Sequence, residues 1–198
     1  MKRKSEKEGM YMKKESSRLY LRESTFDDCR YFAEWETKPA VTEFFTINAG
    51  RDYEEVVREF LGREGDETQV QFTVCLKADD RPVGRIYISR IDEHYDSLDI
   101  TRIYIADPAM RGKGLGEEAL RLALAYAFED RGCERVTLDY FTGNRIASTL
   151  YQKVGFQNEG NMRHGGKKNG EYVDLHLMSM LRNEYFAGKQ QEEKKAEK

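Results

Sequence analysis

A glycine-rich turn, Arg111-Gly112-Lys113-Gly114-Leu115-Gly116, sets the tightest limit on how this chain can fold. Residues 98–105 before it alternate as a strand does, whereas Leu120, Leu124 and Phe128 after it recur at helical spacing. Glycines at alternate positions allow backbone conformations that a β-carbon would forbid, and they leave several N–H groups pointing together at a helix N-terminus. Such a turn binds phosphate, because the unpaired amides and the helix dipole both favour negative charge.

Three kinds of phosphate site compete for this turn. The P-loop of nucleotide hydrolases requires GxxxxGK[ST], and the sequence contains no such string. The dinucleotide-binding fingerprint requires GxGxxG, but Glu117 stands where the third glycine would be. The third kind is the Q/R-x-x-G-x-G/A turn that grips the pyrophosphate of coenzyme A, and Arg111-x-x-Gly114-x-Gly116 matches it fully. The turn therefore favours a coenzyme A site.

Hydrophobic periodicity predicts a mixed α/β domain with the element order β α α β β β α β α β β. One strand–helix–strand crossover is centred on residues 98–141. The ends of the chain differ from this body, because residues 1–17 have no periodicity and residues 188–198 are nearly all polar. We therefore expect one domain over residues 18–187, with a disordered basic tail before it and a charged tail after it.

Composition narrows the class of protein. No stretch approaches the roughly 18 apolar residues that a membrane span needs, and the N-terminus lacks the apolar segment of a secretory signal. Cys29, Cys75 and Cys133 are odd in number and far apart, which argues against a disulfide framework and against a CxxC zinc site. The sequence thus predicts a cytoplasmic protein that contacts no membrane and holds no metal.

The net charge of −3 conceals an uneven distribution. Residues 23–67 hold thirteen acidic and five basic side chains, a net charge of −8. This acidity fits solvated helix faces, and it equally fits a surface that attracts a cationic partner. The body lacks the basic stripe that phosphate backbones require, so a nucleic-acid partner is not expected.

A second motif, Asn144-x-x-Ala147-x-x-x-Tyr151-x-Lys153-x-Gly155-Phe156, follows the next predicted strand. With the glycine turn, it makes residues 18–182 resemble the GNAT superfamily of acyl-CoA-dependent N-acyltransferases. The details are most similar to the bacterial branch that holds ribosomal-protein N-terminal and spermidine acetyltransferases. Ser148 departs from that branch, which often has a bulky aliphatic residue there. The resemblance implies an α/β GNAT fold: a mostly antiparallel mixed sheet, splayed around the cofactor and flanked by helices.

The resemblance also implies an activity and a set of contacts. The expected reaction is acetyl transfer from acetyl-CoA to a primary amine by direct attack in a ternary complex, without a metal. The amine would be a polyamine, a protein N-terminus or an amine-bearing small molecule, and a homodimer is compatible with the family. The residues expected at acetyl-CoA are Ile103, Tyr104, Ile105, Arg111, Gly112, Lys113, Gly114, Leu115, Gly116, Asn144, Ser148, Tyr151 and Lys153.

Acyl transfer to an amine needs an acid and a base. By its place in the second motif, Tyr151 is the expected general acid, since a phenol stays protonated at neutral pH. Asp99 is the expected base, with Glu34, Glu43 or a water chain as alternatives. Glu34, Glu36 and Glu43 are the expected contacts of the amine. A domain that binds coenzyme A without turnover and an interaction role of the charged tails are the competing functions.

Overall fold

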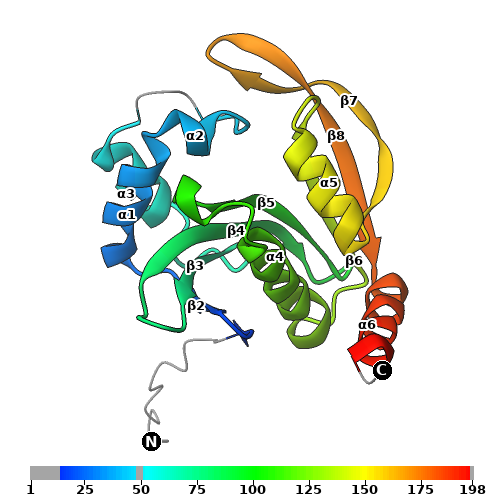
Figure 1. The fold of residues 1–198 in the computed structure, drawn as a ribbon. Helices are drawn as coiled ribbons and strands as arrows, with labels where there is room; N and C mark the ends of the chain where they lie inside the picture. The colour runs from blue at the N-terminus through cyan, green and yellow to red at the C-terminus, as the bar shows by residue number, and fades with distance from the viewer. Residues whose placement is uncertain (1–13, 48–50, 197–198) are drawn as a thin grey trace, which may run out of the picture.

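The computed structural model describes residues 14–47 and 51–196, so residues 1–13 of the tail predicted over residues 1–17 lie outside the described residues. Strands in this part of the chain form one sheet in the order β1-β2-β3-β4-β5-β6-β8-β7 (Figure 1). Only β5 and β6 are parallel, which confirms the mostly antiparallel mixed sheet. The strands are β1 (Lys14–Glu15), β2 (Leu19–Glu23), β3 (Val70–Leu76), β4 (Pro82–Asp92), β5 (Ser97–Ile105), β6 (Arg135–Phe141), β7 (Gln157–Lys168) and β8 (Glu171–Leu181).

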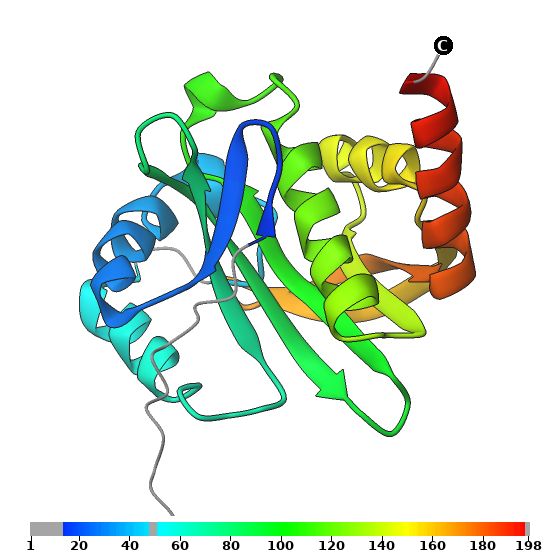
Figure 2. The ribbon, with the colours of Figure 1, turned by 90° about the horizontal axis from the view of Figure 1, so that it is seen from below.

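Helices cover the two faces of the sheet separately, as Figure 2 shows. On one face, α4 and α5 bury the apolar side chains of β2 to β6 and β8, and Tyr185 and Phe186 of α6 pack at the margin of that core. On the other face, α1, α2 and α3 enclose a smaller core that includes Tyr104. The helices are η1 (Phe26–Asp28), α1 (Cys29–Glu36), α2 (Pro39–Thr42), α3 (Tyr53–Leu61), η2 (Pro108–Met110), α4 (Leu115–Ala125), the π-helical turn η3 (Tyr126–Asp130), α5 (Arg145–Val154) and α6 (Arg182–Ala196).

The pairing between β5 and β6 is unusually short. It joins residues 97–99 of β5 to residues 135–137 of β6 and ends at Asp99 and Thr137. Beyond that point residues 100–105 of β5 keep their partner β4, while residues 138–141 of β6 keep β8. Among the described residues, the two edges that face each other carry no strand between them. The sheet therefore opens at its parallel pair, as the resemblance implied.

Pro39 opens the short helix α2, because its fixed φ and missing N–H are tolerated at a first helical position. Two segments differ from the expectations. Lys14–Glu15, expected in the N-terminal tail, pairs with β2. Residues 188–196, expected in a charged tail, continue α6, where Lys189 binds Glu129 at 2.7 Å. No helix of residues 14–47 and 51–196 is long and apolar enough to cross a membrane.

Candidate active site

The glycine turn lies between the end of β5 and the start of α4, as its pattern predicted. Gly112 and Gly114 take positive φ angles of 71° and 79°, and a β-carbon on Gly112 would meet no atom within 4 Å. Gly114 is the N-cap of α4 and offers no side chain to the first amides of the helix. Within the part of the chain described, the amides of residues 112–117 donate to no group. The turn thus presents a row of free N–H donors to an anion.

Two carboxylates in the first turn of α4 would repel a phosphate, but both are neutralised. Glu117 pairs with Lys153 at 2.5 Å and with Arg121 at 3.1 Å. Glu118 pairs with Arg18 at 2.6 Å. The same Arg18 donates from Nη1 to the Lys113 carbonyl at 2.9 Å, so it supports the turn from the N-terminal hairpin. No local pattern singles out Arg18, because its role depends on a contact across about a hundred residues.

The other residues expected at the cofactor surround the opening between β5 and β6. Ile103, Tyr104 and Ile105 lie on the unpaired edge of β5, and Leu115 is buried in the larger core. Asn144 caps α5, since its Oδ1 accepts from the Ala147 amide at 3.1 Å. Ser148 meets the Tyr140 hydroxyl at 3.2 Å, and the Arg111 side chain turns away to donate to the Ala40 carbonyl at 2.7 Å. Gly116 and Lys153 complete this set on α4 and α5.

Tyr151 lies at the opening on the face of α4 and α5. Its ring packs against Tyr140 at 5.6 Å and against Phe156 at 6.0 Å, and it is 8 % exposed. Among the described residues, none forms a hydrogen bond with its hydroxyl. Burial raises the pKa of Tyr151, and the nearby carboxylate of Asp139 raises it further. The phenol therefore stays protonated at neutral pH and its donor is free for a ligand.

Asp99 and Asp139 stand on adjacent strands at the start of the opening. Asp99 is buried, and its two oxygens accept from the hydroxyls of Thr101 and Thr137, both at 2.8 Å. These contacts do not favour Asp99 as the group that meets the amine directly. Asp139 is exposed, and no hydrogen-bond or ion-pair partner contacts it within residues 14–47 and 51–196. Asp139 was not among the residues predicted for the site, although a charge inside the apolar strand RVTLDYF is a usable signal.

Glu36 does not lie where the prediction for it requires. Glu36 is the last residue of α1 and is 1 % exposed, and its oxygens bind Arg85 at 2.7 Å and Arg51 at 2.9 Å. Arg102 and the Tyr104 hydroxyl complete its partners, at 3.2 Å and 3.1 Å. A buried carboxylate with four donors cannot capture a solvent-borne amine. Glu36 instead ties α1 to β4 and β5, and we correct its assignment accordingly.

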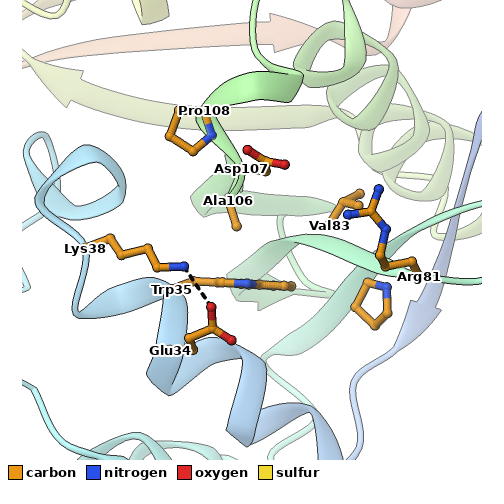
Figure 3. A pocket seen from close by; sticks show the side chains of 9 residues that line it. Glu34, Trp35, Lys38, Arg81, Val83, Ala106, Asp107 and Pro108 are labelled. Atoms are coloured by element: carbon orange, nitrogen blue, oxygen red, sulfur yellow. Dashed lines mark hydrogen bonds and ion pairs between the residues drawn. The ribbon is translucent and has the colours of Figure 1, made fainter.

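Glu34 and Glu43 remain at the surface. Glu34 lines a cavity of about 220 Å³ at the end of α1, where its side chain pairs with Lys38 at 2.8 Å (Figure 3). Asp107 lies across this cavity from Glu34. Glu43 follows α2, and the Lys168 ammonium donates to the Glu43 carbonyl at 2.7 Å and to the Thr42 carbonyl. The β7–β8 hairpin therefore reaches across to α2 on the side of Glu43.

Comparison with known proteins supports the reading of the two motifs. A family model for the acetyltransferase (GNAT) domain matches residues 18–157. The spermidine N(1)-acetyltransferase of Escherichia coli (strain K12) is 24% identical over 167 residues, which cover 84% of this chain and 88% of that protein. A putative ribosomal N-acetyltransferase of Bacillus subtilis, YdaF, is 35% identical over 102 residues, 52% of this chain and 55% of that protein.

The fold is shared with a solved structure. The spermidine N-acetyltransferase of Vibrio cholerae, in complex with CoA and spermine, superimposes with a TM-score of 0.78. The match covers 86% of this chain and 99% of that one at 23% sequence identity. At this identity the likeness shows the fold, and it confirms the α/β architecture expected from the sequence.

Proposed function

This chain belongs to the GNAT family of acetyltransferases, and on that premise we propose that it transfers the acetyl group of acetyl-CoA to a primary amine. One observation carries the proposal. The free amides of the glycine turn, the unpaired edges of β5 and β6, and the partnerless hydroxyl of Tyr151 all border the same opening in the sheet. Acetyl-CoA needs these three features in this order. The amides suit its pyrophosphate, the strand edges suit its extended amide-bearing arm, and the hydroxyl suits its thioester.

The residues at the opening fit acetyl-CoA. The amides of residues 112–117 bind its pyrophosphate, with Lys113 adding positive charge and Arg18 holding the Lys113 carbonyl in place. The unpaired edges of β5 and β6 offer backbone donors and acceptors to its amide-bearing arm, and an N–H of β5 polarises the thioester carbonyl. Acetyl-CoA supplies the activated acyl group. Asn144 and Ser148 border this arm at the start of α5.

Tyr151 is the general acid of the proposed reaction. Its hydroxyl is protonated at neutral pH because burial raises its pKa, and none of the residues that the structure describes holds it in a hydrogen bond. The proton that it donates neutralises the sulfur as the C–S bond breaks. The tyrosine thus stabilises a charge that develops only in the transition state, which is where a donor accelerates the reaction.

A polyamine is the acceptor class that we favour. The relatives that act on spermidine and spermine support it, as do two acidic side chains on the α1–α2 side, Glu34 and Glu43. An amine is protonated in solution, so exposed carboxylates concentrate it near the opening. Assembly into a homo-oligomer is supported by the dodecameric spermidine N-acetyltransferase of Vibrio cholerae.

An assay of free CoA release over a panel of amines tests this function. The panel holds spermidine, spermine, a ribosomal N-terminal peptide and an aminoglycoside, each varied at several fixed, non-saturating concentrations of acetyl-CoA. We expect release with a polyamine, and initial rates that give intersecting double-reciprocal lines, as a ternary complex requires. Binding of acetyl-CoA without release for any amine would instead make the domain a non-catalytic coenzyme A module. Parallel lines would indicate a covalent acyl-enzyme.

A further inference from the structure

The two faces of the opening carry different chemistry. Along β6, Val136, Leu138 and Tyr140 are buried toward α4 and α5, so Asp139 projects to the opposite face. Tyr151 lies on the first face, against Tyr140. The second face is the one that α1, α2 and α3 cover farther along the sheet. The phenol of Tyr151 and the carboxylate of Asp139 therefore lie on opposite faces of the sheet at the same opening.

The register places the two carboxylates next to each other. Asp99 of β5 is opposite Thr137 of β6, and the hydrogen bond between their side chains shows that both share one face. Asp139 is two residues past Thr137 on that face, immediately beyond the last strand pair. Asp99 is buried with hydroxyl partners and without an arginine or lysine in contact among the residues described. No described cation neutralises the carboxylate of Asp99, so its negative charge acts on the neighbouring groups.

Resting on the proposed function, we propose that Asp139 is the general base that deprotonates the amine, and that Asp99 is a positioning residue that holds a negative charge beside it. No described residue forms a hydrogen bond or ion pair with the carboxylate of Asp139, whereas both oxygens of Asp99 are occupied. Because both oxygens of Asp99 already accept hydrogen bonds from threonine hydroxyls, Asp99 acts on the amine through Asp139 and not by direct contact.

The proton balance is complete with these groups. Asp139 takes one proton from the protonated amine, and the freed nitrogen lone pair attacks the thioester carbonyl. The C–N bond forms, the C–S bond breaks, and the sulfur takes the proton of Tyr151. The second proton of the nitrogen restores Tyr151, and Asp139 releases its proton to solvent. The products are the acetylated amine, CoA with its thiol, and one proton.

The charged groups around Asp139 act in opposite directions. Partial burial raises the pKa of Asp139, the charge of Asp99 raises it further, and Arg90 of β4 lowers it. From α5, Tyr151 lies on the other side of the opening as a neutral phenol, and Lys168 lies farther along, 5.9 Å from the Phe141 ring. A general base works best when its pKa lies near the operating pH, and a raised pKa brings the carboxyl group of Asp139 closer to that value. It also costs stability, since the folded state then disfavours the ionised form above the ordinary pKa of Asp.

Four variants test the proposal: Asp139→Asn, Asp139→Glu, Asp99→Asn and, as a control at an exposed aspartate on η1, Asp27→Asn. We expect Asp139→Asn to lower kcat by about 10²-fold or more, within the range for general bases, with acetyl-CoA affinity unchanged in calorimetry. Asp139→Glu should recover part of the rate. The melting temperature of Asp139→Asn at neutral pH should equal or exceed that of the wild type, because the cost of a raised pKa disappears.

Asp99→Asn should move the acid limb of the kcat/KM–pH profile to lower pH, because Asp139 loses the neighbouring charge that raises its pKa. Asp27→Asn should leave the profile in place. The base assignment is overturned if Asp139→Asn turns over at near the wild-type rate while Tyr151→Phe does not, and the proposed function then still stands. An acid limb that stays fixed in Asp99→Asn overturns the role of Asp99.

Discussion

Asp99 and Thr137 form the last backbone pair between β5 and β6, and the Thr137 hydroxyl donates a 2.8 Å hydrogen bond to the Asp99 carboxylate at that point. Past this pair each strand keeps only its outer neighbour, so peptide groups of both strands face an opening. Unpaired strand edges bind extended chains that carry amides. This pair of side chains therefore marks where the pairing of β5 with β6 ends and the proposed acetyl-transfer site begins.

The glycine turn should lose acetyl-CoA affinity when a negative charge is placed on it. Gly112 suits the test, because a β-carbon there meets no atom within 4 Å, and both Asn and Asp tolerate a positive φ. We expect Gly112→Asp to bind acetyl-CoA at least about tenfold more weakly than Gly112→Asn in calorimetry, a difference of about 1.4 kcal/mol. Equal affinities of the two variants would place the pyrophosphate elsewhere.

Removal of the Tyr151 hydroxyl should slow catalysis and spare binding. Tyr151→Phe keeps the packing against Tyr140 and Phe156, so we expect a fall in kcat of about 10²-fold with little change in the dissociation constant of acetyl-CoA. Tyr140→Phe is the matched control, since that neighbouring hydroxyl already meets Ser148. A loss of kcat in Tyr140→Phe as large as in Tyr151→Phe would contradict a distinct role of the Tyr151 hydroxyl as the acid.

Exposed carboxylates near α2 should act on the amine through charge alone. We expect Glu43→Gln to raise KM for spermidine about two- to fivefold at low salt, an effect of about 0.5–1 kcal/mol for an exposed charge. The effect should shrink toward physiological salt, where screening extends over about 8 Å. Glu54→Gln, an exposed glutamate on α3, should leave KM unchanged. If the salt response persists in Glu43→Gln, this carboxylate only solvates its loop.

Glu36 should matter for stability rather than for the amine. Truncation by Glu36→Ala removes the more deeply buried of the two carboxylates, Glu36 and Glu59, that Arg85 and Arg102 share, and breaking a buried pair in this way costs about 3–5 kcal/mol. Glu34→Ala, two residues earlier on the same helix, should cost under about 1 kcal/mol, because its pair with Lys38 is exposed. Urea unfolding measures both values. A loss in Glu36→Ala no larger than in Glu34→Ala would contradict the buried network.

The features that the sequence predicted correctly are those with a local signature. The glycine turn opens a helix because positive φ angles and an uncapped first turn are properties of a few consecutive residues. The role of Tyr151 as the acid rests on the spacing of the second motif and on the resemblance, and it stays a prediction.

Features that depend on contacts between residues far apart in the chain could not be predicted from the sequence. Glu36 was expected at the surface, and its burial depends on arginines 49 and 66 residues farther along the chain. The significance of Asp139 depends on where β5 and β6 separate, which no periodicity within β6 reveals. The C-terminal residues 188–196 are polar, and their helix continues from a first half anchored on the core by Tyr185 and Phe186.

The most direct test of the account follows the acetyl group itself. The purified protein is incubated with isotopically labelled acetyl-CoA and spermidine, and mass spectrometry measures label in the amine, in the protein and in the thioester as CoA is released. The account predicts label on a spermidine nitrogen, equimolar with free CoA, and an unlabelled protein. Label that appears first on the protein, or acetyl-CoA that binds and stays intact with every amine of the panel, would contradict it.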